Sequence, residues 1–233
     1  MTPVIFIPGH LCTAEIYAPQ IASLGGRPYL VADTTQDDTL GAMAERLLAQ
    51  APERFVLAGL SMGGMIAMEV MTRAPERVAG ALLMDTDPYA ARDKENTYRE
   101  SVIARVRAEG LMSFVDQFTP RLYGHSPDAM AQLLPAARAM MGAMPVDVFY
   151  RQSAALMSRR DMLPLIAGFA GPVTVLVGEK DVICPPVVHQ AMAEALPDAA
   201  YVEVPGAGHI PTLETAATVT HALHDLLARC DAG

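Results

Sequence analysis

The chain has 233 residues, 52% of them hydrophobic and 18% charged, which is enough to bury a large core as a single α/β unit. Its net charge is −9 and its basic residues are not clustered, which argues against a nucleic-acid partner, and no apolar run approaches the roughly 20 residues of a membrane-spanning helix. Three cysteines without metal-ligand spacing, and an N-terminal segment without the features of a signal peptide, predict a cytoplasmic protein with free thiols.

Short apolar runs alternate with helix-length amphipathic segments along the chain. Four to six apolar residues without polar alternation are typical of strands buried on both faces of a parallel sheet. The predicted strands are residues 3–9, 28–33, 54–60, 80–86, 172–178 and 200–206. The predicted helices are residues 39–52, 62–78, 185–197 and 211–230. This alternation predicts right-handed crossovers and a doubly wound, mostly parallel α/β sheet of about six strands.

Residues 87–165 interrupt the alternation, because they contain no clear strand. They contain four helical patches instead, at about 91–109, 111–123, 127–142 and 145–159. The third patch begins like a helix, with Ser126 as the N-cap and Pro127 at the first helical position. The segment is too apolar for a linker, so we predict a helical lid inserted after the fourth strand, with residues 1–86 and 166–233 forming the core.

Ser61 stands between the predicted strand at 54–60 and the predicted helix that begins at Met62, with Gly59 and Gly63 on either side in the stretch GLSMGG. Glycine has no Cβ, so both positions can lie close to neighbouring backbone in a tight turn. The serine hydroxyl is then expected at a helix N-terminus, where the N–H of Met62 can donate to an oxyanion. A Gly-x-Ser-x-Gly pattern can arise by chance, but its placement between strand and helix favours a nucleophile.

A serine nucleophile needs a base, and His209 is the best placed of the six histidines. It follows the last predicted strand in a glycine-rich loop, at the same end of the sheet as Ser61. His189 falls within a predicted helix. His221 and His224 lie three residues apart on the last helix and could share a metal, but no third ligand is near, which favours a solvated helix face.

The base in turn needs a carboxylate that fixes its tautomer. Asp181 follows the strand at 172–178, in the loop VLVGEKDVICPP, at the carboxyl end of the sheet. Asp85, at the end of the preceding strand, is a rival because its strand neighbours that of the nucleophile. Glu179 is a further neighbour. We favour Asp181 over Asp85.

Three segments resemble the motifs of the α/β-hydrolase superfamily in the same chain order. GLSMGGMIAMEVMTRAPERV resembles the nucleophile elbow, GEKDVICPP the acid loop and GAGHIPTLE the histidine loop. Small carboxylesterases and enol-lactonase-like enzymes look most similar. The resemblance implies that two strands usually found before residue 4 are missing. It also implies that the N–H of His10, with Leu11 as the fallback, is the second oxyanion donor beside Met62. The His10 side chain is either a turn residue or a substrate contact.

The resemblance implies a serine hydrolase that cleaves a small, largely apolar carboxylic ester or lactone through an acyl-enzyme, with no metal or organic cofactor. Carbon–carbon bond hydrolysis, cofactor-free perhydrolysis and a ligand receptor without turnover are alternatives on the same residues. The expected partner is a small molecule, with neither nucleic acid nor membrane. The protein is a monomer or a homodimer, since residues 28–33 should form a sheet edge that invites pairing.

Two groups of sulfur-containing residues complete these expectations. Cys12 and Cys184 should border the active end of the sheet without being catalytic, because a nucleophilic thiol needs its own base and a lowered pKa. The methionines at 140, 141 and 144 either help to form an apolar substrate pocket or pack the lid on itself.

Overall fold

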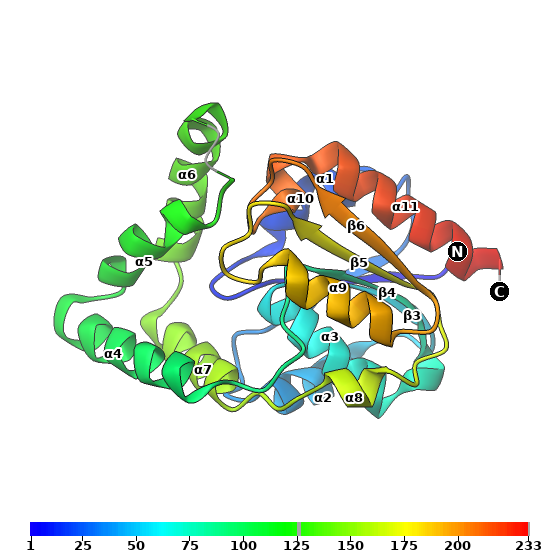
Figure 1. Ribbon diagram of the computed structural model, residues 1–233, viewed down its shortest axis with the longest axis horizontal. Coiled ribbons are helices and arrows are strands. Elements are labelled where there is room, and N and C mark those ends of the chain that lie inside the picture. Colours follow the sequence, from blue (N-terminus) through cyan, green and yellow to red (C-terminus); the bar gives the residue numbers. More distant parts are fainter. Residues whose placement is uncertain (125–126, 233) are drawn as a thin grey trace.

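The computed structural model describes residues 1–124 and 127–232, leaving aside the side chains of residues 127–129. Six strands form one sheet in which every neighbouring pair is parallel, in the order β2-β1-β3-β4-β5-β6 (Figure 1). The strands are β1 Val4–Ile7, β2 Tyr29–Val31, β3 Phe55–Leu60, β4 Val78–Met84, β5 Val173–Gly178 and β6 Ala199–Val204. The predicted α/β architecture and the number of strands are therefore confirmed.

The central strands of the sheet are more buried than the two edge strands. All residues of β1, β3, β4 and β5 are buried, as expected for strands covered on both faces. The edge position predicted for residues 28–33 is confirmed, although only the three residues of β2 pair as a strand. The opposite edge is β6, most of whose residues are at least partly exposed. Its apolar run gave no sign of this position, because an edge strand can be as apolar as a central one.

Helices cover both faces of the sheet. The first face carries α2 Leu40–Gln50, α3 Met62–Arg73, α8 Leu163–Ile166 and α9 Pro186–Ala195. The other face carries α1 Ala18–Ala22 and α11 Ala216–Ala232, with α10 Pro211–Glu214 before it. The single helix predicted over 211–230 is thus two helices, because Thr215 between them has a non-helical backbone with φ −134°.

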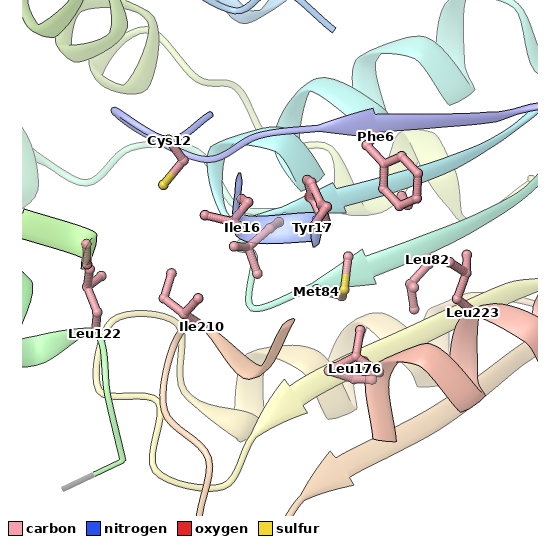
Figure 2. Packing of buried hydrophobic residues seen from close by; sticks show 14 of the residues in the cluster. Phe6, Cys12, Ile16, Tyr17, Leu82, Met84, Leu122, Leu176, Ile210 and Leu223 are labelled. Atoms are coloured by element: carbon pink, nitrogen blue, oxygen red, sulfur yellow. The ribbon is translucent and has the colours of Figure 1, made fainter. Parts of the chain in front are cut away.

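The core on the α11 face connects the sheet to the segment that follows β4. Figure 2 shows Phe6 and Leu82 from the sheet, with Tyr17 and Leu223 packed in the same cluster. Leu122, from the helical segment, belongs to this cluster too. The segment is therefore anchored by apolar burial, the main favourable contribution to folding, rather than tethered as a linker.

Four helices make up most of the insertion between β4 and β5. They are α4 Asp93–Glu109, α5 Met112–Phe118, α6 Pro127–Gly142 and α7 Val146–Met157. They stand to one side of the sheet, on the side toward which the arrows of β5 and β6 point (Figure 1). The predicted N-cap Ser126 lies outside the described residues, and α6 begins at the predicted Pro127. Where the core ends and the lid begins stays a prediction.

None of the helices in the described part of the chain combines the length and the apolar character that a membrane crossing requires.

Candidate active site

Ser61 occupies the turn between β3 and α3 in a strained backbone conformation. Its φ is 56° and its ψ is −119°, and such a positive φ is uncommon for a residue with a Cβ. Its N–H donates to the carbonyl of Met84 at 2.9 Å, which ties the turn to β4. The glycines have the predicted role: a Cβ on Gly59 would collide with the Gly63 backbone, and one on Gly63 with the carbonyl of Ile7.

Ser61, His209 and Asp181 form a continuous hydrogen-bonded chain. Oγ of Ser61 lies 2.9 Å from Nε2 of His209, and Nδ1 of His209 lies 2.7 Å from Oδ2 of Asp181. A carboxylate only accepts hydrogen bonds, so Nδ1 carries the proton and Nε2 is left to accept from the serine hydroxyl. The three residues come from three loops at the carboxyl end of the sheet, as the sequence predicted.

Asp181 is held in its ionised form despite its burial. Burial alone would raise the pKa of its carboxyl group, but His209 and the N–H groups of Ile183 and Cys184 outweigh burial and lower it. These two N–H groups donate to Oδ1 at 2.8 and 3.1 Å. The carboxylate is therefore fixed in place by the backbone of its own loop while its other oxygen contacts the imidazole.

The rival Asp85 lies behind this carboxylate. Its side chain is fully buried, and its Oδ1 accepts from the N–H of Gly178 at 2.9 Å. Burial first, and then the negative charge of Asp181, raise the pKa of Asp85 well above its usual value, and its buried Oδ2 has no hydrogen-bond partner within the described residues. A protonated, neutral Asp85 accounts for both observations, because a neutral carboxyl group can be buried beside the Asp181 carboxylate without a cationic partner. Within the described residues, the imidazole of His209 contacts Asp181 and not Asp85.

Neither the N–H of His10 nor that of Met62 donates a hydrogen bond to another described residue. Leu11, the fallback donor, is already occupied: its N–H donates to Oε1 of Gln152 at 2.8 Å. The two predicted donors are thus not engaged elsewhere, and their role as the oxyanion hole stays a prediction. Gln152, on α7, was not predicted at all, since a glutamine on an amphipathic helix carries no motif.

The remaining histidines differ sharply in environment. Burial lowers the pKa of His189 to about 4, and its Nε2 accepts from the N–H of Thr86 at 2.8 Å. Burial, and then the charge of Arg99, lower the pKa of His10 to about 3. His221 is on an exposed helix face, as predicted, where it pairs with Asp225.

One group within the described residues has the composition of a metal site. Ligand atoms of Asp181, Cys184 and His209 lie within 4.8 Å of one another. Burial, and then the charge of Asp181, raise the pKa of Cys184, so this thiol resists the deprotonation that metal binding requires. The other two residues are already hydrogen-bonded to each other. The donor set therefore does not favour a metal.

Ser61 opens into a cavity of about 230 Å³ between the sheet and the insertion. Its apolar lining includes Met65, Val102, Phe114, Phe118, Leu156 and Ile183. A second cavity of about 20 Å³ also reaches Ser61 and His209.

Some of the sulfur-containing residues line the two cavities and others do not. Cys184 lines the larger cavity and Cys12 the smaller one, so both border the site as predicted. Burial raises the pKa of Cys12 to about 12, which disfavours a thiolate. Of the two alternatives for the lid methionines, packing describes Met140 and Met144, which lie against the core cluster and line neither of these two cavities. Met141 lines only the smaller cavity.

Comparison with known proteins settles the family. Residues 4–222 match the sequence model of the alpha/beta hydrolase family. The chain belongs to this family. Among curated proteins, this alpha/beta hydrolase is similar to a pimeloyl-acyl-carrier protein methyl ester esterase of Aromatoleum aromaticum, with 26% identity over 231 residues that cover 91% of this chain and 85% of the relative.

Solved structures agree with this assignment. A thermophilic esterase from Thermogutta terrifontis superimposes with a TM-score of 0.87 at 26% identity, covering 99% of this chain and 90% of its own. The enol-lactonase from Burkholderia xenovorans LB400 gives a TM-score of 0.87 at 22% identity, covering 98% of this chain and 92% of its own. The protein is thus a hydrolase of the alpha/beta fold, and the second likeness bears on the fold alone.

Proposed function

We propose that this alpha/beta hydrolase cleaves a carboxylic ester or lactone through an acyl-enzyme on Ser61, in the cytoplasm. The observation that carries the proposal is the hydrogen-bonded chain from the Ser61 hydroxyl through His209 to Asp181, with the N–H groups of His10 and Met62, which donate to no other described residue, beside it. The esterase activity named for two relatives at 26% identity supports an ester as the substrate.

The chemistry follows from the hydrogen bonds. His209 Nε2 accepts the hydroxyl proton as Ser61 Oγ attacks the carbonyl carbon, and the resulting imidazolium is stabilised by Asp181. The negative charge that develops on the carbonyl oxygen is stabilised by the N–H groups of His10 and Met62. His209 then returns the proton to the leaving alcohol. Water, deprotonated by the same imidazole, attacks the acyl-enzyme and releases the acid.

The test is turnover by the purified protein on a panel of p-nitrophenyl esters, lactones and diketones, compared with Ser61→Ala. We expect many turnovers on esters or lactones, and a loss of almost all of them in Ser61→Ala with an unchanged melting curve. A carbon–carbon hydrolase would be slow on every ester, and a receptor would release no more than about one equivalent of p-nitrophenol. Full activity in Ser61→Ala would refute the proposal.

A further inference from the structure

The cavity at Ser61 contains charged side chains that a wholly apolar substrate does not require. Besides its apolar lining, it is bordered by Asp87, Glu95, Arg99, Arg121 and Arg159. Charges are costly to take out of water unless they are paired. Which of these charges already has a protein partner therefore decides what the cavity can bind.

The two carboxylates are fully engaged by two arginines. Glu95 forms ion pairs with Arg92 and Arg159. Asp87 lies 3.7 Å from Arg92 and 3.6 Å from Arg159, measured between carboxylate oxygen and guanidinium nitrogen. Two negative charges thus face two positive ones, and this part of the cavity wall is neutral.

Arg99 and Arg121 are the two arginines of this lining for which the described residues supply neither a side-chain hydrogen bond nor an ion pair. Arg121 is exposed to solvent, whereas Arg99 is only partly exposed, so Arg99 is the one that gains more from a bound anion. Burial, and then the neighbouring charge of Arg159, lower its pKa to about 10, so it still carries its charge near neutral pH. It is thus a cation in a concave site whose nearest carboxylates are committed to other arginines.

His10 lines the cavity together with Arg99 and Ser61. The residue is buried, and the charge of Arg99 acts on its ring. The buried Nε2 of His10 has no hydrogen-bond partner in the part of the chain that the structure describes. His10, whose Nε2 is unpaired, and Arg99, whose guanidinium is unpaired, therefore both line the cavity that reaches Ser61.

We propose that Arg99 binds a carboxylate at the far end of the acyl chain whose ester carbonyl Ser61 attacks. This inference rests on the proposed function and names its substrate class, esters of short acyl chains that end in a carboxylate. The planar guanidinium matches a carboxylate with two parallel hydrogen bonds. A monoanion suits the site better than a phosphate dianion, because Glu95 and Asp87 lie nearby. A volume below the roughly 300 Å³ of most ligand pockets favours a short chain.

The experiment compares ester pairs of equal chain length that differ only at the end of the chain. Mono-p-nitrophenyl adipate is paired with p-nitrophenyl hexanoate, and mono-p-nitrophenyl pimelate with p-nitrophenyl heptanoate. The measured quantity is the ratio of kcat/KM for the charged ester over its neutral partner, after subtraction of spontaneous hydrolysis. We expect a ratio above one in the parent protein, reduced about 10- to 100-fold in Arg99→Gln and less in Arg99→Lys.

The matched control is Lys94→Gln, which removes one positive charge from an exposed position on the same helix, outside the cavity. It should leave the ratio unchanged, and the parent's ratio should persist in about 0.5 M NaCl, since salt screens exposed charges far more than buried ones. Melting curves test folding, and the Arg99→Lys variant serves if Arg99→Gln unfolds.

Three results are decisive against the inference. Equal rates on charged and neutral esters in the parent protein would overturn it while leaving the esterase proposal intact. A ratio that Lys94→Gln or salt abolishes would overturn it as well, in favour of steering by surface charge. Absence of turnover on every ester would instead refute the proposed function, and the inference with it.

Discussion

Asp85 and Asp181 lie side by side but differ in protonation, which gives them different sensitivity to the same substitution. Asp181→Asn should lower kcat by up to about 10⁴-fold, because an amide cannot fix the His209 tautomer or stabilise the imidazolium. Asp85→Asn should lower kcat by less than about tenfold, because an amide is as uncharged as a protonated Asp85 and its oxygen can still accept the Gly178 N–H. The measurement is kcat on one activated ester, with melting curves for both variants.

Asp85→Leu is the control for this prediction. It removes the acceptor of the buried Gly178 N–H, so it should lower stability and kcat more than Asp85→Asn does. A large loss in Asp85→Asn beside a nearly normal Asp181→Asn would assign the orienting role to Asp85 and contradict the protonation described above.

At the scale of residues, the sequence was informative where a backbone requirement or a chain order limits the choice. Ser61 could be predicted because a strand-to-helix turn needs glycines around it, and His209 and Asp181 because they follow strands whose ends meet. Gln152 could not, since it acts through contacts with distant segments, and Arg99 could not, since only the folded chain shows which arginines of the cavity are left without a carboxylate. The Gln152 contact with Leu11 spans 141 residues of sequence.

At the scale of elements, Gln152 links α7 to two loops of the core. Its Oε1 accepts from Leu11 N–H, and its Nε2 donates to the carbonyl of Thr34 at 3.0 Å. Gln152→Leu leaves two buried backbone groups without partners, which should cost about 1–3 kcal/mol of unfolding free energy for each. It should also lower kcat more than it raises KM, because the turn next to Leu11 carries the His10 N–H. Urea unfolding and steady-state kinetics measure both effects.

Gln50→Leu makes the same substitution at an exposed position at the end of α2 and should change neither quantity. Unchanged stability in Gln152→Leu would mean that the helical insertion is held by its apolar contacts alone.

The boundaries of the helices were also only partly predictable from the sequence. The helix predicted over 211–230 breaks at Thr215, where neither glycine nor proline announces a break.

At the scale of the whole molecule, two histidines are buried in their neutral form. The pKa of His189 is lowered to about 4 and that of His10 to about 3, chiefly by burial, from a usual value of 6.5. Unfolding frees both rings to take up protons, so their contribution to stability is complete above pH 6.5 and is lost as the pH falls toward 4. Asp85 has the opposite effect on the pH dependence of stability. Its pKa is raised in the folded protein, so its contribution to stability is lost as the pH rises.

His189→Gln separates these opposing effects, because parent and variant both retain Asp85. Glutamine can accept the Thr86 N–H in place of Nε2 but does not titrate. The difference in melting temperature between pH 7 and pH 5 should therefore be smaller in the variant than in the parent, by the contribution of one buried imidazole. His221→Gln is the matched control: its side chain is 80% exposed, so its removal should leave the parent's pH dependence nearly unchanged. If His189→Gln lost stability in acid as steeply as the parent, the ring would have to be charged in the folded protein. Nε2 of His189 could then not accept the hydrogen bond from the Thr86 N–H, and the assignment of that bond would be wrong.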